Sequence, residues 1–295
     1  MVLPNFLCVG TQKAGTTSLH NILIQHSNIY LPKKKETKFF VDDSLFEKGL
    51  SYYESEFFSK WNGEKAIGEV DPDYMYFEYV PERIYGFLGK DIKLIFFLRN
   101  PVERAYSHYL MSKGRGIEKL SFLEAVKVER ERIHKDFFSK SHFSYITRGF
   151  YSEQIKRFLR FFPKENMFFA IFEKDFLNDR ANLFKKLFNF LDVPEKKEID
   201  FNIKSNPAFG SHVPLLSRII HEKPKWAKSF ANIFIPNKKI KRKIAVMLDE
   251  INKKPIKKRE LNVNEKYFLY KTYFKKEIQE LEKLINRDLS IWREF

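Results

Sequence analysis

The sequence predicts a single α/β domain in which a parallel sheet is flanked by helices. Three observations favour this fold. A short apolar run at 6–9 is followed by a glycine-bounded loop and then by an amphipathic helix. Residues 92–98 form a nearly continuous apolar run, which is typical of a parallel strand buried on both faces. Further strand patterns alternate with helical patterns along the chain, as they do in parallel α/β sheets.

The first predicted elements are the strand at 6–9 and the loop from Gly10 to Gly15. Residues 16–18, Thr-Thr-Ser, then open the helix. Backbone N–H groups of such a loop and of the first helical turn can point at an anion, and the helix dipole favours the negative charge. This stretch is therefore predicted to hold a phosphate-like group, although an ordinary strand–turn–helix corner is the plainer interpretation.

The loop departs from the P-loop of nucleoside triphosphatases at one position. A P-loop has the pattern G-x-x-x-x-G-K-[ST], in which a lysine follows the second glycine. Here Gly10 and Gly15 are in place, but Thr16 follows, and the lysine of the loop is Lys13. We therefore expect a P-loop-like fold whose loop suits a shorter anion bound without a metal. A P-loop nucleotide kinase remains the alternative enzyme.

The remaining elements follow in order along one domain, 1–295. The segment 212–260 is basic and irregular, and we interpret it as a lid-like insertion. Its stretch 238–258 is expected to border an acceptor site, whereas a solvated helix face without a role is the alternative. A C-terminal helix within 264–292 is expected to pack back onto the domain. The other predicted strands are 66–70 and 167–172, and the other helices are 44–60, 81–88, 101–114, 121–133, 150–162 and 179–191.

A second pair of candidate anion ligands follows the apolar run at 92–98. Arg99 comes directly after the strand, at the sheet edge where α/β proteins place ligands. Ser107 lies one to two turns into the next helix, and a guanidinium with a hydroxyl can clamp a phosphate. An NTPase would place an aspartate here to hold magnesium, so Arg99 argues against that class. An arginine that merely ends a strand is the plainer interpretation.

These two motifs resemble those of sulfotransferases that use 3′-phosphoadenosine 5′-phosphosulfate (PAPS), of the bacterial or glycan-type branch. The run 13–17, Lys-Ala-Gly-Thr-Thr, matches their 5′-phosphosulfate loop, [KR]-x-G-T-[TS]. The second motif matches their pattern R-x-P-x-x-R-x-x-S through Arg99, Pro101, Arg104 and Ser107. The resemblance covers roughly residues 5–195 and returns at 288–292.

The resemblance implies transfer of a sulfuryl group from PAPS, without a metal, to a hydroxyl of a carbohydrate, lipid-linked or other metabolite acceptor. It places the 3′-phosphate on Arg99 and Ser107. Tyr151 could approach the nucleotide or acceptor, but an aromatic residue on an apolar helix face is more typical of a core. Ser211 is a candidate in the 206–212 loop, where the family's Lys-Gly-Arg triplet is missing. The residues implied for the 5′-phosphosulfate are Lys13, Ala14, Gly15, Thr16, Thr17 and Ser18.

Sulfation of a hydroxyl also needs a base. Heparan-type relatives carry their catalytic glutamate in K-E-x-x-[FY]-F, which the run 35–40, Lys-Glu-Thr-Lys-Phe-Phe, matches. Glu36 is therefore the candidate base, and Lys13 the candidate cation for the bridging oxygen. Glu36 could instead neutralise a lysine run, and His108 is the alternative base, as in cytosolic aryl and steroid enzymes. Val70 stands where the heparan enzymes have a lysine in E-K-x-P, which weighs against a heparan-like acceptor.

The composition adds a strongly basic charge, +16 with an isoelectric point near 9.6. Such a charge attracts anions, so the acceptor is expected to be anionic or presented at a membrane, without a specific nucleic-acid partner. A non-enzymatic module that binds polyanions or membrane surfaces is the second alternative, and it would show salt-dependent binding without nucleotide specificity. The single cysteine, Cys8, and an N-terminus without a signal peptide or anchor predict a cytoplasmic protein.

Overall fold

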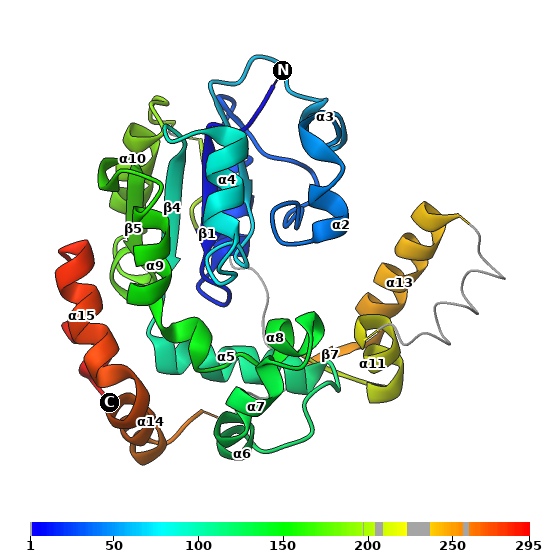
Figure 1. Cartoon of the computed structure of the whole chain (residues 1–295), viewed down its shortest axis with the longest axis vertical. Coiled ribbons are helices and arrows are strands. Elements are labelled where there is room, and N and C mark those ends of the chain that lie inside the picture. The colour runs from blue at the N-terminus through cyan, green and yellow to red at the C-terminus, as the bar shows by residue number, and fades with distance from the viewer. Residues whose placement is uncertain (1, 197, 204–208, 223–236, 256–259) are drawn as a thin grey trace. The chain divides into compact units, whose positions relative to one another are not determined.

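The computed structural model describes residues 2–196, 198–203, 209–222, 237–255 and 260–295 (Figure 1). The predicted α/β class is confirmed. Internal contacts divide the chain into two compact units. The first contains Met1–Arg104, Phe150–Ser205 and Tyr267–Phe295, and the second contains Ala105–Gly149 and Asn206–Lys266.

The first unit is built on a five-stranded sheet with the order β2-β3-β1-β4-β5, in which all neighbours are parallel. Cys8 of β1 is in register with Val70 of β3 and with Ile95 of β4, so these three strands end at one edge. The four predicted strands are confirmed, whereas β2 was not predicted because it has only two residues. The strands are β1 (Phe6–Gly10), β2 (Ile29–Tyr30), β3 (Ala66–Val70), β4 (Lys93–Leu98) and β5 (Met167–Ile171).

Helices cover both faces of this sheet. Cys8, Ile95 and Phe97 share one buried cluster with apolar residues of α1 (Thr16–Leu23) and α10 (Arg180–Phe190). On the opposite face, Phe96 meets Phe158 of α9 (Tyr151–Leu159) edge to face, with the ring centroids 5.3 Å apart. The alternation of side chains along each strand thus explains why the strands are apolar throughout.

Other helices of the first unit are more broken than predicted. The expected helix at 44–60 consists of three short pieces, and Gly49 has a positive φ of 77° at the junction. The expected C-terminal helix is confirmed but contains a π-helical turn, and the buried Trp292 follows it. The elements are α2 (Asp43–Phe46), α3 (Gly49–Tyr53), η1 (Glu54–Phe58), α4 (Val80–Leu88), η3 (Lys164–Asn166), η4 (Phe172–Leu177), α14 (Val263–Leu269, which begins in the second unit), η5 (Tyr270–Phe274), α15 (Lys275–Ile285) and η6 (Ser290–Arg293).

The second unit is mostly helical and corrects one prediction. The described part of 212–260 is not irregular, because it holds two amphipathic helices and a strand that pairs antiparallel with β6. Its dense lysines obscured the helical period, and its role as a lid stays a prediction. The elements are α5 (Pro101–Gly114, which begins in the first unit), α6 (Phe122–Lys127), α7 (Glu129–Ile133), α8 (Phe137–Phe143), η2 (Thr147–Gly149), β6 (Phe209–Ser211), α11 (Pro214–Glu222), α13 (Lys238–Asn252) and β7 (Lys253–Pro255).

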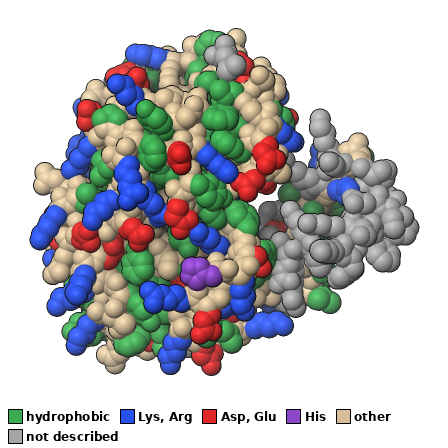
Figure 2. All heavy atoms as spheres, viewed as in Figure 1, with side chains coloured by type: hydrophobic (Ala, Val, Ile, Leu, Met, Phe, Trp, Pro, Cys, Tyr) green, Lys and Arg blue, Asp and Glu red, His purple; other side chains and the backbone are tan. Residues whose placement is uncertain are grey.

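Charged side chains are mixed on the visible face of the molecule. Figure 2 shows lysines and arginines spread among aspartates and glutamates there, without one large basic patch. Across the described ranges, no helix is both long and apolar enough to cross a membrane.

Candidate active site

The loop after β1 has the shape of an anion cradle. Lys13 and Gly15 both have left-handed backbones, with φ of 71° and 90°. A Cβ on Gly15 would lie 2.7 Å from the Phe172 ring, so glycine is required by both the backbone and the space. Helix α1 begins at Thr16, and no side chain of the described residues caps it at Gly15. Its first N–H groups can therefore donate to an anion.

Arg99 reaches this loop, as the two sequence motifs led us to expect. Its Nη1 donates a hydrogen bond to the Lys13 carbonyl oxygen at 2.9 Å. The guanidinium carbon lies 5.2 Å from the centroid of the Phe172 ring, and Nε lies 3.9 Å from Glu173 Oε1. The buried Nε has no hydrogen-bond partner among the described residues. The two predicted anion motifs thus meet at the same edge of the sheet.

A group of hydrogen-bonded residues holds the backbone of Arg99 and its neighbour Glu173 in place. Tyr151 is fully buried, and its hydroxyl donates to the Arg99 carbonyl oxygen at 2.9 Å. Burial raises the pKa of the Tyr151 phenol, which favours the neutral donor. Trp292 Nε1 donates to Glu173 at 2.8 Å, and Glu173 also accepts the Asn100 N–H at 3.0 Å. This arrangement favours the interpretation of Tyr151 as a core residue that fixes the arginine.

Three other candidates belong to the second unit. Ser107 is partly buried in α5. His108 is fully buried, and its ring centroid lies 5.1 Å from that of Tyr145. Ser211 ends β6 opposite Lys253, and residues 206–208 of its predicted loop lie outside the described residues. The roles of Ser107, His108 and Ser211 therefore stay predictions.

The segment that carries Glu36 is anchored to the end of β3, next to β1. Glu36 donates its backbone N–H to the Val70 carbonyl oxygen at 3.2 Å. Lys38 donates its backbone N–H to Asp71 Oδ2 at 2.9 Å. Asp71 in turn donates its backbone N–H to the Cys8 carbonyl oxygen at 3.0 Å, which ties the segment to the strand before the anion loop. Glu36 is thus held at the sheet edge where that loop begins.

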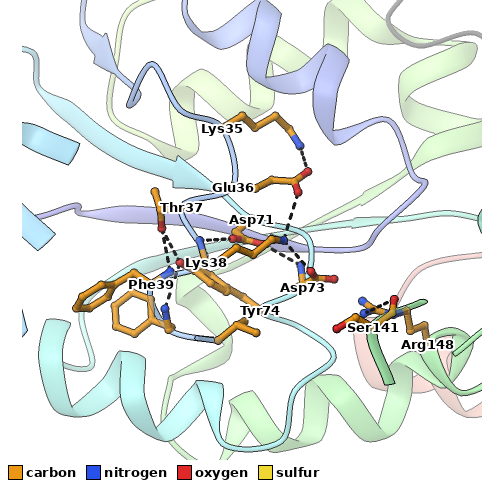
Figure 3. A network of polar contacts seen from close by, with 12 residues as sticks. Lys35, Glu36, Thr37, Lys38, Phe39, Asp71, Asp73, Tyr74, Ser141 and Arg148 are labelled. Atoms are coloured by element: carbon orange, nitrogen blue, oxygen red, sulfur yellow. Dashed lines mark hydrogen bonds and ion pairs between the residues drawn. The ribbon is translucent and has the colours of Figure 1, made fainter. Parts of the chain in front are cut away.

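Two lysines form ion pairs with the Glu36 carboxylate (Figure 3). Lys35 Nζ lies 2.6 Å from Oε1, and Lys38 Nζ lies 3.2 Å from Oε2. Burial alone would raise the pKa of Glu36, but Lys38 and Lys35 outweigh it and lower this pKa to about 2. The carboxylate is therefore charged at ordinary pH and 37% exposed, so it can accept a hydrogen bond from an acceptor hydroxyl.

A buried carboxyl group, Glu69, lies beneath this segment. It accepts hydrogen bonds from Thr37 Oγ1 at 2.7 Å and from the hydroxyls of Tyr53 and Tyr74 at 2.5 Å each. Burial, with a smaller contribution from the charge of Asp71, raises the pKa of Glu69 to about 7 against the effect of these hydrogen bonds. Thr37 lies between Glu36 and Lys38 in the sequence. Its hydrogen bond to Glu69 therefore fixes the middle of the candidate catalytic segment.

Four further residues of the site were not predicted from the sequence: Lys38, Glu69, Asp71 and Asp73. A usable signal was present, because polar residues directly after a predicted parallel strand lie at the ligand edge of the sheet. Asp71 and Asp73 follow the strand at 66–70 in this way, but this stretch entered the sequence prediction only through the family's E-K-x-P segment, where Val70 replaces the lysine.

Replacing Glu69 by glutamine should change how stability depends on pH. The pKa of Glu69 is about 7 in the folded protein and about 4.5 in the unfolded chain, so the folded state binds the carboxyl proton more tightly. This proton binding stabilises the fold fully below pH 4.5, and the stabilisation is lost as the pH rises to about 7. The Glu69→Gln variant should therefore gain roughly 2–3 kcal/mol of unfolding free energy relative to the parent between pH 5 and pH 8. Denaturant titrations at both pH values measure this difference. The exposed Glu47→Gln control should show no such gain, and an equal effect of Glu69→Gln at both pH values would contradict the assignment.

The fold and the candidate site are those of a P-loop-like α/β protein with a glycine-bounded loop after β1, an arginine that contacts this loop, and a carboxylate at the same edge of the sheet. The sulfotransferase-domain family matches residues 3–206. The chain belongs to this sulfotransferase family and is an enzyme of that type. This membership decides against both a P-loop kinase and a non-enzymatic module.

The chain is similar to several known sulfotransferases. The chain is 38% identical over 114 residues to the membrane-associated sulfotransferase kil1 of Dictyostelium discoideum, covering 38% of this chain and 24% of that protein. It is 30% identical over 192 residues to human heparan sulfate glucosamine 3-O-sulfotransferase 6, covering 64% and 52%. The chain thus spans about half or less of these curated relatives. The crystal structure of a sulfotransferase from Alicyclobacillus acidocaldarius matches with a TM-score of 0.70 at 26% identity and full coverage of both chains.

Proposed function

We propose that this enzyme transfers a sulfuryl group from PAPS to a hydroxyl of an acceptor. The observation that carries the proposal is the hydrogen bond from Arg99 Nη1 to the Lys13 carbonyl oxygen. It brings together two predicted anion-binding elements that are far apart in the sequence. A donor with phosphate groups at both its 3′ and 5′ positions matches such a pair better than a nucleotide with one phosphate cluster.

The residues fit the donor as follows. The loop 13–18 and the start of α1 would hold the 5′-phosphosulfate through backbone N–H groups. Arg99, whose Nε lacks a hydrogen-bond partner in the described part of the chain, would take the 3′-phosphate. The role of Ser107 rests on the resemblance of its motif alone. The Lys13 ammonium would stabilise charge that develops on the bridging oxygen as the S–O bond breaks.

Glu36 would act on the acceptor. Its carboxylate would accept the hydrogen bond of the attacking hydroxyl, align the oxygen with the sulfur, and receive the proton late in the transfer. A pKa of about 2 makes Glu36 a weak base, so its main contribution would be orientation and charge rather than early proton removal. No covalent enzyme intermediate is needed, because the hydroxyl oxygen attacks the sulfur directly.

The acceptor class follows from the relatives and from this chain's charge. The relatives named for heparan sulfate support a carbohydrate, whereas kil1 is named as membrane-associated. With a net charge of +16, we propose a carbohydrate or lipid-linked hydroxyl that is anionic or presented at a membrane. Mass spectrometry of pooled acceptors incubated with PAPS tests this, because one of them should gain a sulfuryl group. The absence of transfer to every hydroxyl class tested would overturn the proposal.

Ligand choice provides a second test that does not need the acceptor. Calorimetry without magnesium should show tight binding of 3′-phosphoadenosine 5′-phosphate and weak binding of AMP and ATP. The Arg99→Ala variant should lose about 2–5 kcal/mol of binding free energy for the bisphosphate, because a charge pair is removed. Arg160→Ala, at an exposed arginine that ends α9, is the matched control and should bind like the parent. Equal affinity for AMP and the bisphosphate would remove the role of Arg99.

A further inference from the structure

The Lys38 ammonium has an environment unlike that of a surface lysine. Its Nζ lies 2.7 Å from Asp73 Oδ2, 2.9 Å from Asp71 Oδ1 and 3.2 Å from Glu36 Oε2. The Asp71 side chain is fully buried and that of Asp73 is 10% exposed, so both carboxylates need a cation. These attractions outweigh burial and raise the pKa of Lys38. The lysine therefore stays charged.

The backbone is shaped to bring Lys38 and Glu36 together. Both residues have left-handed backbones, with φ of 64° and 62°, which is uncommon for residues other than glycine. Thr37 between them is fixed by its hydrogen bonds to Glu69 and Tyr74. Lys38 is bound to Asp71 twice, through its backbone N–H and its side chain. Such strained conformations persist only where the surroundings hold them firmly.

The two lysines that contact Glu36 differ in how firmly they are held. Lys35 lies closer to the carboxylate, at 2.6 Å, but its ammonium makes no other ion pair among the described residues. Lys38 is tied to Asp71 and Asp73, both of which follow β3. Of these two lysines, Lys38 therefore links the Glu36 carboxylate to residues that follow the sheet.

We propose that Lys38 is a positioning residue that fixes the Glu36 carboxylate in place for the transfer. This inference rests on the proposed role of Glu36. The charged and titratable groups that face Glu36 are Lys35 and Lys38 on its own segment, His20 on α1, and Asp71 and Asp73 after β3. Of these, Lys38 is the cation that contacts both Glu36 and the two aspartates.

The variant Lys38→Met tests the proposal, with Lys38→Arg as the conservative variant and Lys35→Met as the matched control. The Glu36 carboxyl carbon is followed by ¹³C NMR against pH in the free protein, and its signal is assigned by its loss in Glu36→Gln. We expect the Glu36 titration to move upward by at least about one pH unit in Lys38→Met, which corresponds to at least about a tenfold change in proton affinity. It should stay near its parental position in Lys38→Arg and move less in Lys35→Met.

Kinetics gives the second readout. Turnover in Lys38→Met should fall by about 10²-fold at pH 6, because a misplaced group loses alignment. A Glu36 titration whose pKa moves upward from about 2 by about one pH unit still lies below pH 5, so this loss should be nearly constant over pH 5–8. Binding of 3′-phosphoadenosine 5′-phosphate should be unchanged, and Lys38→Arg should restore most of the turnover. A loss of turnover in Lys38→Arg equal to that in Lys38→Met, with the Glu36 titration unmoved in Lys38→Met, would indicate a merely structural role and overturn the proposal.

Two precautions keep the test decisive. If Lys38→Met does not fold because Asp71 is left unpaired, the double variant Lys38→Met/Asp71→Asn removes that buried charge, and the same titration is measured in it. An unmoved Glu36 titration in either variant overturns the positioning role alone. Full turnover in Glu36→Gln would instead overturn the proposed base, so the two failures are distinguishable.

Discussion

Replacing Glu36 by glutamine is expected to lower sulfuryl transfer by about 10²–10⁴-fold, the usual contribution of a positioned base. The amide keeps the shape of the side chain and its carbonyl can still accept from Lys35 or Lys38, but the negative charge is lost. Binding of 3′-phosphoadenosine 5′-phosphate should change little. Steady-state turnover with PAPS and a saturating acceptor measures the effect.

The pH profile of Glu36→Gln sharpens this prediction. A group whose pKa is lowered to about 2 supports the rate above that pH and fails only as the pH falls through it. The loss in Glu36→Gln should therefore be uniform across pH 5–8 (about the range in which the fold is most stable). The alternative base, His108, is fully buried. If Glu36→Gln kept most of the rate while His108→Gln lost it, the histidine would be the base.

Replacing Lys13 by alanine should cost about 10²–10³-fold in turnover, the usual effect of removing one group that stabilises charge in the transition state. The Lys13 carbonyl oxygen that accepts from Arg99 belongs to the backbone and is retained. Because residue 13 has a φ of 71°, Lys13→Gly should be made as well, since glycine adopts this conformation without strain.

Controls for Lys13 separate charge from shape. Lys13→Arg should keep more activity than either neutral variant, and Lys33→Ala, at an exposed lysine of the same N-terminal region, should behave like the parent. Single-turnover rates with bound PAPS distinguish the chemical step from binding. Parental rates in both Lys13→Ala and Arg99→Ala would place the site elsewhere.

Much of the sheet could be predicted because each of its longer strands is a recognisable apolar run in the sequence. The run 92–98 is apolar on both faces, and the structure buries it between helices on both sides. The two-residue strand β2 carries no such pattern. Its place in the sheet depends on pairing with β3, which a local pattern does not reveal.

The candidate site was predictable only in part. The approach of Arg99 to Lys13 followed from two motifs at the ends of neighbouring strands. The contacts of Lys38 with Asp71 and Asp73 span 33 and 35 residues and depend on left-handed backbones at Glu36 and Lys38. Such conformations at residues other than glycine have no sequence signature, so the motif identified Glu36 but not what holds it.

The hydrogen bond from Asn100 to the Trp292 carbonyl oxygen joins residues 192 positions apart. Contacts with so large a sequence separation carry a high loop-closure entropy and raise the contact order of a fold. The sheet can assemble from nearer neighbours along the chain, whereas the backing of Arg99 by Trp292 and Glu173 requires this distant contact. The part of the site that contains Arg99 is therefore expected to form late in folding, after the strands have paired. A partly folded chain would then contain the loop after β1, but Arg99 would not yet be held in place by Glu173 and Trp292.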